Sequence, residues 1–269
     1  MSNELTVLVC GIGEDASAVA RGLFGEGYAV ALHKCTSPLA LRRRMSFADA
    51  WYDGYAVLDG VEARRADVAS EFMLGLQSHA FIPLLRGQLA DVIERWPWHV
   101  IIAAREDRED EPASFLSLAE FTIGLGSSFS PGVDCDAAIA THGPDPGAIL
   151  RAGDSWPKEW PEAQDIIVSA PRAGQFRADM PIGALATQGA PIGFIGETPV
   201  PAPAGGRIVG IARREQAVAE GAPIAEIAEN VTARVAGVSR RSQLVARAAS
   251  FAIELENEGI KPFSFEDWR

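Results

Sequence analysis

The stretch Gly189-Ala190-Pro191-Ile192 returns unchanged 32 residues later as Gly221-Ala222-Pro223-Ile224. Around it, Ala170-Pro171 returns as Ala202-Pro203, and Gly174 and Ile195 return as Gly206 and Ile227. Repetition at a fixed offset indicates one supersecondary unit built twice. Each copy has the pattern of short strands separated by an Ala-Pro turn and a Gly-x-Pro turn, and neither is long enough to bury a core alone. The repeat therefore predicts one small β-sandwich over 166–232, in which the two copies interlock.

This predicted sandwich resembles the biotinyl/lipoyl barrel-sandwich, whose halves are related by a quasi-twofold axis and which usually carries a cofactor on a lysine. The hairpin between the copies, Gly196-Glu197-Thr198-Pro199-Val200, contains no lysine. The three lysines of the chain, Lys34, Lys158 and Lys261, lie outside 166–232. The sequence therefore argues against bound biotin or lipoate and favours a structural or docking role for the sandwich.

The composition of the 269-residue chain is that of a folded protein with two modest domains, since 48% of its residues are hydrophobic and 22% are charged. The net charge of −12 argues against a nucleic-acid or anionic-membrane partner. No apolar run approaches the roughly 18 residues of a membrane-spanning helix. The N-terminus lacks the basic region of a signal peptide, and three distant cysteines fit a reducing compartment, so a cytoplasmic location is expected.

The first half begins with an apolar run, Leu5–Val9, that leads through Cys10-Gly11-Ile12-Gly13 into apolar residues at helical spacing. Gly27 ends that helix and Tyr28–Leu32 begins a second strand. This pattern predicts a Rossmann-like, doubly wound α/β domain over 1–150. The further strands expected are Val57–Val61, Phe81–Leu84, Val100–Ala103, Phe121–Leu125 and Ala137–Thr141, and the further helices are Phe72–His79 and Leu89–Trp96.

A linker and a C-terminal helix complete the expected organisation. Two Trp-Pro steps make 151–165 a packed, extended linker, and 233–269 is expected to hold a helix and tail. Ser239 suits the start of that helix and Gly259 its end. Its packing face is predicted to consist of Leu244, Ala248, Phe251, Ala252 and Leu255. The fold class is therefore α/β, with a Rossmann-like domain followed by an all-β barrel-sandwich and a C-terminal helix.

The stretch Gly11-Ile12-Gly13-Glu14-Asp15-Ala16 fits the pattern G-x-G-x-x-G/A between a strand and a helix. The glycines allow a tight turn close to a phosphate, and the helix N-terminus offers free N–H groups. We expect Gly11, Gly13 and Ala16 to bind the phosphate of a cofactor. Glu14 and Asp15 would repel an anion placed close to them, so a purely architectural turn is the alternative.

The second strand ends in His33-Lys34-Cys35, where NAD-binding chains place an acidic residue for the ribose. His33 or Lys34 could instead bind the 2′-phosphate of NADP, or the two could form an ordinary surface pair.

The charge run Arg105–Pro112 is predicted to be a solvated loop.

Three arginines, Arg42–Arg44, follow the second strand where its loop crosses the carboxyl edge of the sheet. Guanidinium groups suit phosphate, so Arg42 and Arg43 are candidates for the same ligand. The alternative is a helix face whose arginines pair with Asp49 and Asp53.

A second Gly/Ser loop, 124–132, also follows a strand, so Gly126, Ser127 and Ser128 are expected to form the other wall of the crevice. Cys10, Cys35 and Cys135 lie next to these loops, and their convergence on a soft metal is one alternative to three small core residues. Their spacing matches no metal motif, so no metal is expected. No catalytic residue is identified, since the sequence has no G-x-S-x-G elbow, no CxxC and no paired-histidine motif.

With the glycine turn and the repeated sandwich, the strings CTSPLALRRRMSFADAWYDG (35–54) and TIGLGSSFSPGVDCDAAIATHG (122–143) resemble the YqeB-type family. That family is linked to maturation of selenium-dependent molybdenum hydroxylases, and its nucleotide-fold half is related to the xanthine dehydrogenase accessory factor XdhC. The resemblance covers nearly the whole chain. It implies an accessory protein that handles molybdenum cofactor, or its sulfur or selenium ligand, for a client hydroxylase.

The chain departs from that family's pattern at three candidate sites. His33-Lys34 stands in place of an acidic residue, Ala140-Thr141-His142-Gly143 in place of Glu-Thr-x-Arg-Gly, and Ser239–Gln243 in place of a Ser-Asp-Lys-Ala-Arg-like run. These changes imply a divergent member with a different partner. We expect molybdopterin, as molybdenum cofactor, or a nucleotide in the Rossmann-like crevice. An NADP-dependent oxidoreductase and a ligand-free interaction scaffold are the alternatives, and the oligomeric state stays open.

Overall fold

The computed structural model describes residues 3–106, 111–156 and 165–257, which form two compact units. The first unit contains 3–38, the described part of 46–156, and 238–257. The second contains 39–45 and 165–237. The arginine segment 39–45, expected in the first domain, thus groups with the β-rich unit, and the C-terminal helix groups with the α/β unit.

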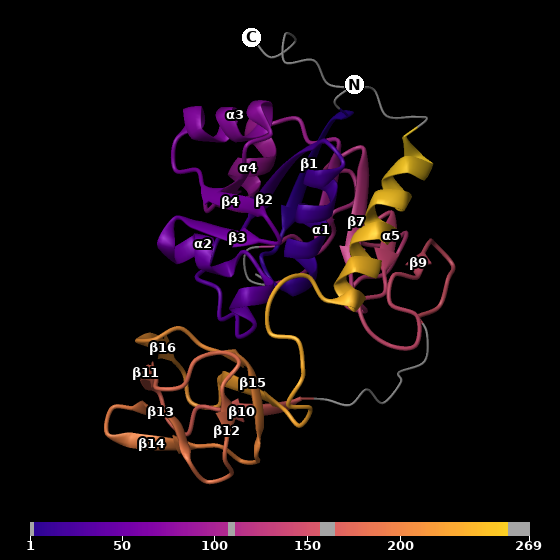
Figure 1. Cartoon of the computed structure of the whole chain (residues 1–269). Coiled ribbons are helices and arrows are strands. Elements are labelled where there is room, and N and C mark those ends of the chain that lie inside the picture. The colour runs from indigo at the N-terminus through magenta and orange to yellow at the C-terminus, as the bar shows by residue number, and fades with distance from the viewer. Residues whose placement is uncertain (1–2, 107–110, 157–164, 258–269) are drawn as a thin grey trace. The chain divides into compact units, whose positions relative to one another are not determined.

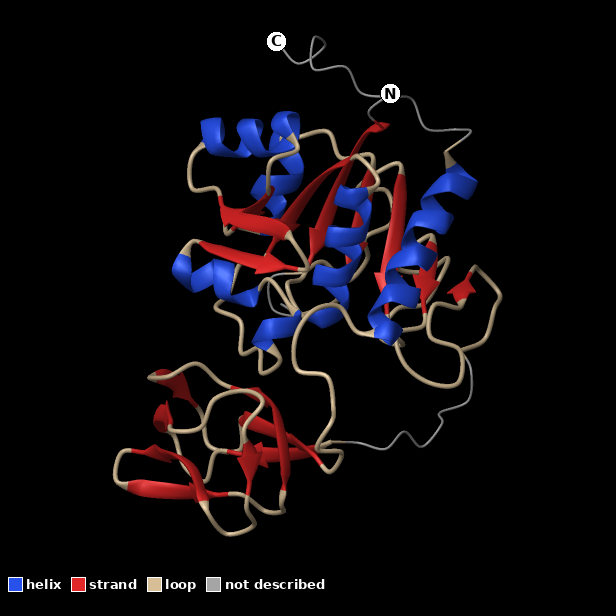
Figure 2. Ribbon diagram, in the orientation of Figure 1, coloured by secondary structure: helices blue, strands red, loops and turns tan. Residues whose placement is uncertain are grey.

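The first unit is a nine-stranded sheet with helices packed on it (Figures 1 and 2). The strand order is β3-β4-β5-β2-β1-β6-β7-β8-β9. The strands are β1 (Asn3–Cys10), β2 (Tyr28–His33), β3 (Tyr55–Leu58), β4 (Val61–Arg65), β5 (Ile82–Leu85), β6 (Val100–Ala103), β7 (Phe121–Leu125), β8 (Ala137–Ile139) and β9 (Ile149–Leu150). The helices are α1 (Glu14–Gly25), α2 (Ala48–Asp53), α3 (Ala69–Ser78), α4 (Leu89–Arg95) and α5 (Arg240–Glu256).

The centre of this sheet is parallel and buried on both faces. Strands β2, β6 and β7 consist only of buried residues, as the continuous apolar runs of the sequence indicate. β1 pairs in parallel with β2 on one side and with β6 on the other, and β6 pairs in parallel with β7. The order of the sheet therefore reverses at β1, and the carboxyl ends of β1, β6 and β7 meet at one edge. In open α/β sheets, a ligand crevice lies at such a reversal.

One predicted strand of this sheet is wrong in detail. The run Val57–Val61 spans two antiparallel strands, because Asp59 and Gly60 both have positive φ and form the turn of a β3–β4 hairpin. Helix α2 and the short strand β9 also went unrecognised, since each is too short to show a period.

The C-terminal helix begins as predicted, because the Ser239 side chain accepts a hydrogen bond from the Ser242 backbone N–H. Its predicted packing face is right for Ala248 and Ala252, which are buried, and wrong for the three large residues: Leu244, Phe251 and Leu255 are 39%, 53% and 56% exposed. The buried face consists mostly of small residues, Ser242, Val245, Ala246, Ala248, Ala249, Ser250, Ala252 and Ile253. α5 lies beside α1 (Figure 1), so close that a Cβ added at Gly22 would lie 3.3 Å from Ala246 Cβ. Large side chains would not fit there. The predicted end at Gly259 lies outside the described residues.

The second unit consists of two four-stranded antiparallel sheets. Its strands are β10 (Ile166–Ser169), β11 (Gly174–Ala178), β12 (Leu185–Ala186), β13 (Pro191–Ile195), β14 (Thr198–Pro201), β15 (Gly206–Ile211), β16 (Gln216–Val218) and β17 (Pro223–Ala228). The sheet orders are β10-β17-β15-β12 and β14-β13-β11-β16. A shift of 32 residues relates the two orders strand by strand, since β10, β11, β12 and β13 correspond to β14, β15, β16 and β17. Each sheet therefore contains two strands from each copy.

The repeated turns bind each other reciprocally. Gly189 N–H donates to Ala202 O at 2.9 Å, and the corresponding Gly221 N–H donates to Ala170 O at 2.9 Å. Ala202 and Ala170 in turn donate their N–H groups to the alanines of the opposite Gly-Ala-Pro turns. The two copies thus interlock, as the repeat predicts.

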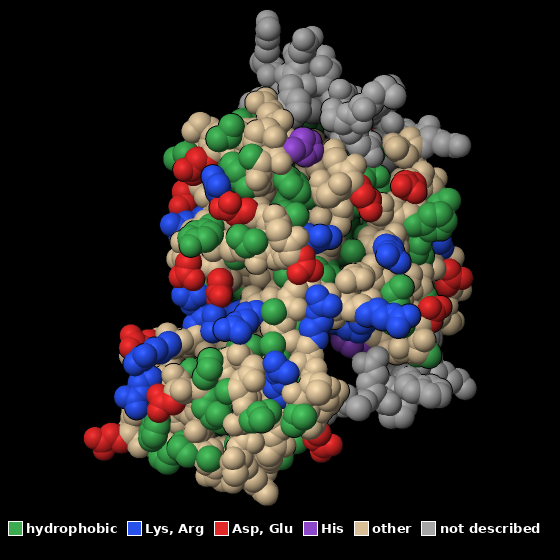
Figure 3. Space-filling model, in the orientation of Figure 1, with side chains coloured by type: hydrophobic (Ala, Val, Ile, Leu, Met, Phe, Trp, Pro, Cys, Tyr) green, Lys and Arg blue, Asp and Glu red, His purple; other side chains and the backbone are tan. Residues whose placement is uncertain are grey.

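No helix within the described ranges is long and apolar enough to cross a membrane. On the face drawn in Figure 3, acidic and basic side chains of the first unit are interspersed.

Candidate functional site

The glycine turn lies where β1 ends and α1 begins, at the reversal of the sheet. Gly11 has φ +134°, which strongly favours glycine. Gly13 is the N-cap of α1 and carries no side chain that could cap the helix, so the first N–H groups are left for another acceptor. Ala16 is buried in the core and contributes close packing rather than a surface group.

The carboxylate of Glu106 occupies this turn. Ile12 N–H donates to Glu106 Oε2 at 3.0 Å, and Gly13 N–H donates to Glu106 Oε1 at 2.8 Å. A Cβ added at Gly11 or at Gly13 would lie 2.8 Å from Glu106 Oε1, so both glycines make room for this carboxylate. The turn therefore binds an oxyanion through its backbone, and in this conformation the oxyanion belongs to the chain itself.

Glu106 is the site residue that the sequence analysis missed. It belongs to the charge run Arg105–Pro112, whose residues 107–110 lie outside the described part. A mixed charge run usually faces water, and only the position of Glu106 just after β6, next to β1, brings it to the turn.

Arg105, the residue before Glu106, is anchored to the second loop. Its φ is +50°, and its guanidinium donates to Asp134 Oδ2 at 2.8 Å and lies 4.4 Å from the centre of the Phe129 ring. Both contacts come from the Gly/Ser loop after β7 and its continuation. That loop is shaped by Gly124, since a Cβ there would overlap Phe129 at 2.2 Å. The two loops singled out from the sequence thus meet at one edge, joined by Arg105-Glu106.

The predicted residues of the second loop lie at its surface. Gly126 has φ +91° and donates its N–H to Ile139 O at 2.9 Å, so it makes the turn out of β7. Ser127 and Ser128 are exposed. Their role toward a ligand stays a prediction.

Glu14 and Asp15, expected to repel an anion, are engaged by α5. Arg241 binds Asp15 Oδ2 at 2.8 Å and Glu14 Oε1 at 3.6 Å. Ser242 Oγ donates to Asp15 Oδ1 at 2.8 Å and also bonds Glu14 Oε1 at 3.1 Å. The charge of Arg241 compensates these acids, which weakens their repulsion of an anion at the turn.

His33 and Lys34 are not a surface pair, because their exposed fractions are only 2% and 4%. His33 Nε2 lies 2.8 Å from Gly87 O, and Lys34 Nζ donates to Glu106 O at 3.4 Å. The lysine therefore adds a buried positive charge beside the segment that carries the resident carboxylate.

Arg42 and Arg43 belong to the second unit. Arg42 donates from Nε and Nη2 to the two carboxylate oxygens of Glu226, at 2.7 and 2.8 Å, and from Nη2 to Asp165 Oδ2 at 2.5 Å. Burial raises the pKa of Asp165 above its ordinary value; Arg42 opposes that shift and Glu226 adds to it. Arg43 Nε donates to Ile211 O at 3.2 Å. Arg42 thus binds two carboxylates of the second unit that the sequence did not suggest as partners. A ligand shared by these arginines and the glycine turn stays a prediction.

Of the three cysteines, Cys10 and Cys135 are buried and Cys35 is half-buried. Burial, together with the charge and hydrogen bond of Asp134, raises the pKa of Cys135 to about 12. Among the described residues, no group of three or more His, Cys, Asp or Glu side chains is arranged to hold a metal ion.

The chain is similar to a curated protein of unknown function over most of its length. It is 28% identical over 233 residues to a protein of Escherichia coli (strain K12) described as "Uncharacterized protein YqeB". The match covers 84% of this chain and 43% of the relative, so the chain spans less than half of that protein's length. No protein-family model matches the chain.

Proposed function

We propose that this protein is an accessory protein in the maturation of a molybdenum hydroxylase, and that its first unit binds a phosphate-bearing cofactor, either molybdopterin or a nucleotide. In this proposal the first unit is a Rossmann-like domain, and the phosphate replaces the Glu106 carboxylate at the glycine turn. The second unit is a barrel-sandwich that carries no cofactor and contacts the client enzyme or supports the site.

The observation that carries the binding part is the pair of hydrogen bonds from Ile12 N–H and Gly13 N–H to one carboxylate. Backbone N–H groups at a helix N-terminus hold phosphate by the same geometry and with the same sign of charge. The location supports it as well, since the turn lies where the strand order reverses.

The maturation part rests on the similarity to YqeB over most of the chain and on the family resemblance of 35–54 and 122–143. The departures at His33-Lys34 and 140–143 support a divergent member with its own client. A selenium or sulfur role and a relationship to XdhC are part of this proposal.

Native mass spectrometry of gently purified protein, followed by extraction of the bound molecule, tests the proposal. We expect a pterin or a nucleotide to be recovered from the wild type, and a larger occupied fraction in Glu106→Gln. The matched control is Glu120→Gln, which removes the same charge from an exposed side chain just before β7, at the opposite edge of the sheet.

Three results would contradict parts of the proposal. Recovery of NADP with measurable turnover of NADPH would favour an oxidoreductase. Absence of any bound pterin or nucleotide, together with no binding of either on titration, would refute the cofactor site. Full activity of the molybdenum hydroxylases in a strain that lacks this protein would refute the maturation role.

A further inference from the structure

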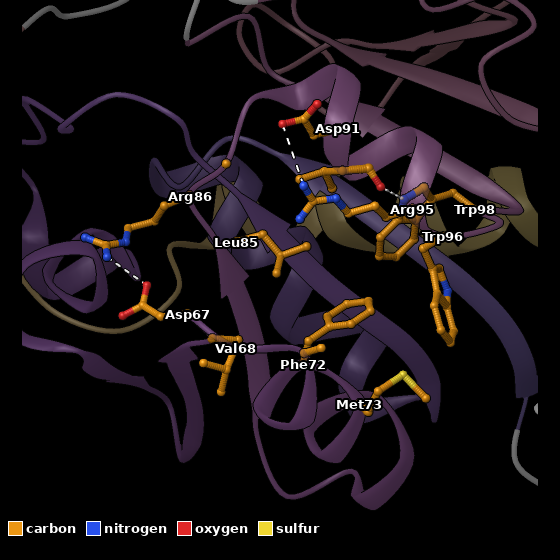
Figure 4. A pocket seen from close by; sticks show the side chains of 14 residues that line it. Asp67, Val68, Phe72, Met73, Leu85, Arg86, Asp91, Arg95, Trp96 and Trp98 are labelled. Carbon is orange, nitrogen blue, oxygen red and sulfur yellow. Dashed lines mark hydrogen bonds and ion pairs between the residues drawn. The ribbon is translucent and has the colours of Figure 1, made fainter.

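A cavity of about 440 Å³ lies between α3 and α4 of the first unit (Figure 4). Its volume is in the range of small-molecule sites, roughly 300–1,000 Å³. Small residues keep it open, since Ala66 and Ala69 line it on the side of β4 and α3, and Gly87 lines it after β5. None of its lining residues belongs to the glycine turn, so this cavity is separate from the anion site proposed above.

Aromatic and apolar side chains form most of the cavity wall. Phe72 packs edge-on against Trp96, with ring centroids 5.3 Å apart, and its centroid is 6.1 Å from that of Trp98. Figure 4 shows Phe72, from α3, and Leu85, from β5, facing the same space. Both are only half-buried, and Val68 at the rim is 55% exposed. An apolar occupant would therefore bury surface that the protein alone leaves in water.

Arg86 and Asp67, two charged residues of the wall, are fixed by contacts within the protein. Asp67 is held by two arginines, since Arg86 Nη2 lies 2.7 Å from Oδ1 and Arg65 Nε lies 2.8 Å from Oδ2. Arg86 Nε is buried and has no hydrogen-bond partner among the described residues. The Arg86 guanidinium also lies 5.4 Å from the centre of the Trp51 ring, which fixes its position.

A second arginine lies at the mouth of the cavity on α4. The Arg95 side chain is 80% exposed, and its ion pair with Asp91, one helical turn earlier, is long at 3.9 Å. Such a pair in water contributes little, so the guanidinium can turn toward a better acceptor at small cost. The cavity therefore joins an aromatic wall to an accessible guanidinium that suits an anionic group.

We propose that this cavity is a binding site for a small planar aromatic molecule that carries one anionic group. The ring packs against Phe72, Leu85 and Met73. The anionic group accepts hydrogen bonds at the mouth from Arg95.

The probe that tests this site is 1-anilinonaphthalene-8-sulfonate, an aromatic sulfonate, compared with N-phenyl-1-naphthylamine, the same ring system without the sulfonate. We expect the sulfonate to bind the full-length folded protein at one saturable site. Arg95→Gln should weaken the sulfonate about tenfold and leave the neutral amine unchanged, because only the charged hydrogen bond is lost. Ala69→Phe should abolish binding of both probes by filling the cavity.

Control variants distinguish binding in this cavity from non-specific binding to other apolar surface. Leu74→Ala removes an exposed apolar side chain from the same helix outside the cavity and should leave both affinities unchanged. Circular dichroism and thermal unfolding verify that each variant is folded. If Ala69→Phe does not fold, Ala69→Glu replaces it, because an acid in the first turn of a helix favours the helix while it repels the sulfonate. Absence of saturable binding, or equal affinities in wild type, Arg95→Gln and the Ala69 variant, would overturn the proposal.

Discussion

Replacing Glu106 should make the protein less stable and at the same time a better binder of anions. The two hydrogen bonds from Ile12 N–H and Gly13 N–H to the carboxylate are charge-assisted, and such bonds contribute about 1.5–3 kcal/mol each when buried. One of the two is exposed and the other only partly buried, so solvent screening reduces the pair to about 1–2 kcal/mol. Glu106→Ala should lower the free energy of unfolding by that amount.

The contact that stabilises the folded protein also competes with a ligand, because the ligand must displace the Glu106 carboxylate from the turn. While Glu106 occupies the turn, only the fraction of molecules with a vacant turn can bind, and the apparent affinity falls by that fraction. A contact of about 1–2 kcal/mol corresponds to a factor of about 5–30. Titration with inorganic pyrophosphate in a calorimeter should therefore show Glu106→Ala, and to a lesser degree Glu106→Gln, binding more tightly than the wild type by up to that factor.

The control for this experiment is Glu120→Gln, which changes the net charge equally and should bind pyrophosphate as the wild type does. A general charge effect would move both variants together. The reasoning is refuted if Glu106→Ala loses stability but gains no affinity, since the carboxylate would then be a structural brace without competition from a ligand.

Three further predictions concern the scaffold. Arg42→Ala should destabilise the protein by about 2 kcal/mol in urea unfolding, because it leaves two carboxylates facing each other without their cation. The control Arg177→Ala, which removes an exposed ion pair, should cost less than about 0.5 kcal/mol. Equal losses of stability in the two variants would contradict this prediction. The Cys135 thiol should resist iodoacetamide at pH 8 while Cys35 reacts. Because folding raises the pKa of Cys135, stability should fall as the pH rises from about 9 toward 12, and a flat profile would argue against that shift. Ser239→Ala should cost about 1 kcal/mol in thermal unfolding, and Ser239→Asp should restore it; no loss in the alanine variant would mean that the cap is dispensable.

The parts of the fold that the sequence predicts well are those coded by nearby residues. The 32-residue offset relates chemically identical turns. The Gly-Ala-Pro turn of each copy binds the Ala-Pro turn of the other, so the two copies interlock as the repeat predicts. The buried strands of the first unit are continuous apolar runs, and their positions follow from periodicity within a few residues.

The parts that the sequence does not predict depend on contacts between distant residues. The position of Arg42 after β2 predicts a phosphate-binding residue. In the structure it binds Glu226 and Asp165, which lie 184 and 123 residues further along the sequence. Helical spacing places Leu244, Phe251 and Leu255 on the inner face of α5, but they are exposed because the close approach of α1 requires small residues there. Neither fact has a local signal, since charge and size alone do not say which neighbour a residue will meet.

The glycine turn can be explained as a ligand site or as a purely architectural brace, and the two explanations have different consequences. Gly11 and Gly13 leave the space in which the Glu106 carboxylate lies, and Gly124 leaves the space for the Phe129 ring that packs under Arg105. A purely architectural turn would need these glycines for the same reason, so the glycine pattern alone cannot separate a ligand site from a brace. The two explanations differ in whether the carboxylate can be displaced. Phosphate will bind to these N–H groups only if the free energy lost on releasing Glu106 is smaller than the free energy gained on binding the phosphate. Because one of the two backbone hydrogen bonds to the carboxylate is exposed to water, breaking that pair costs about 1–2 kcal/mol, well below the roughly 8 kcal/mol of a micromolar ligand. This comparison supports the proposal that the carboxylate is exchangeable, and the pyrophosphate titration tests it.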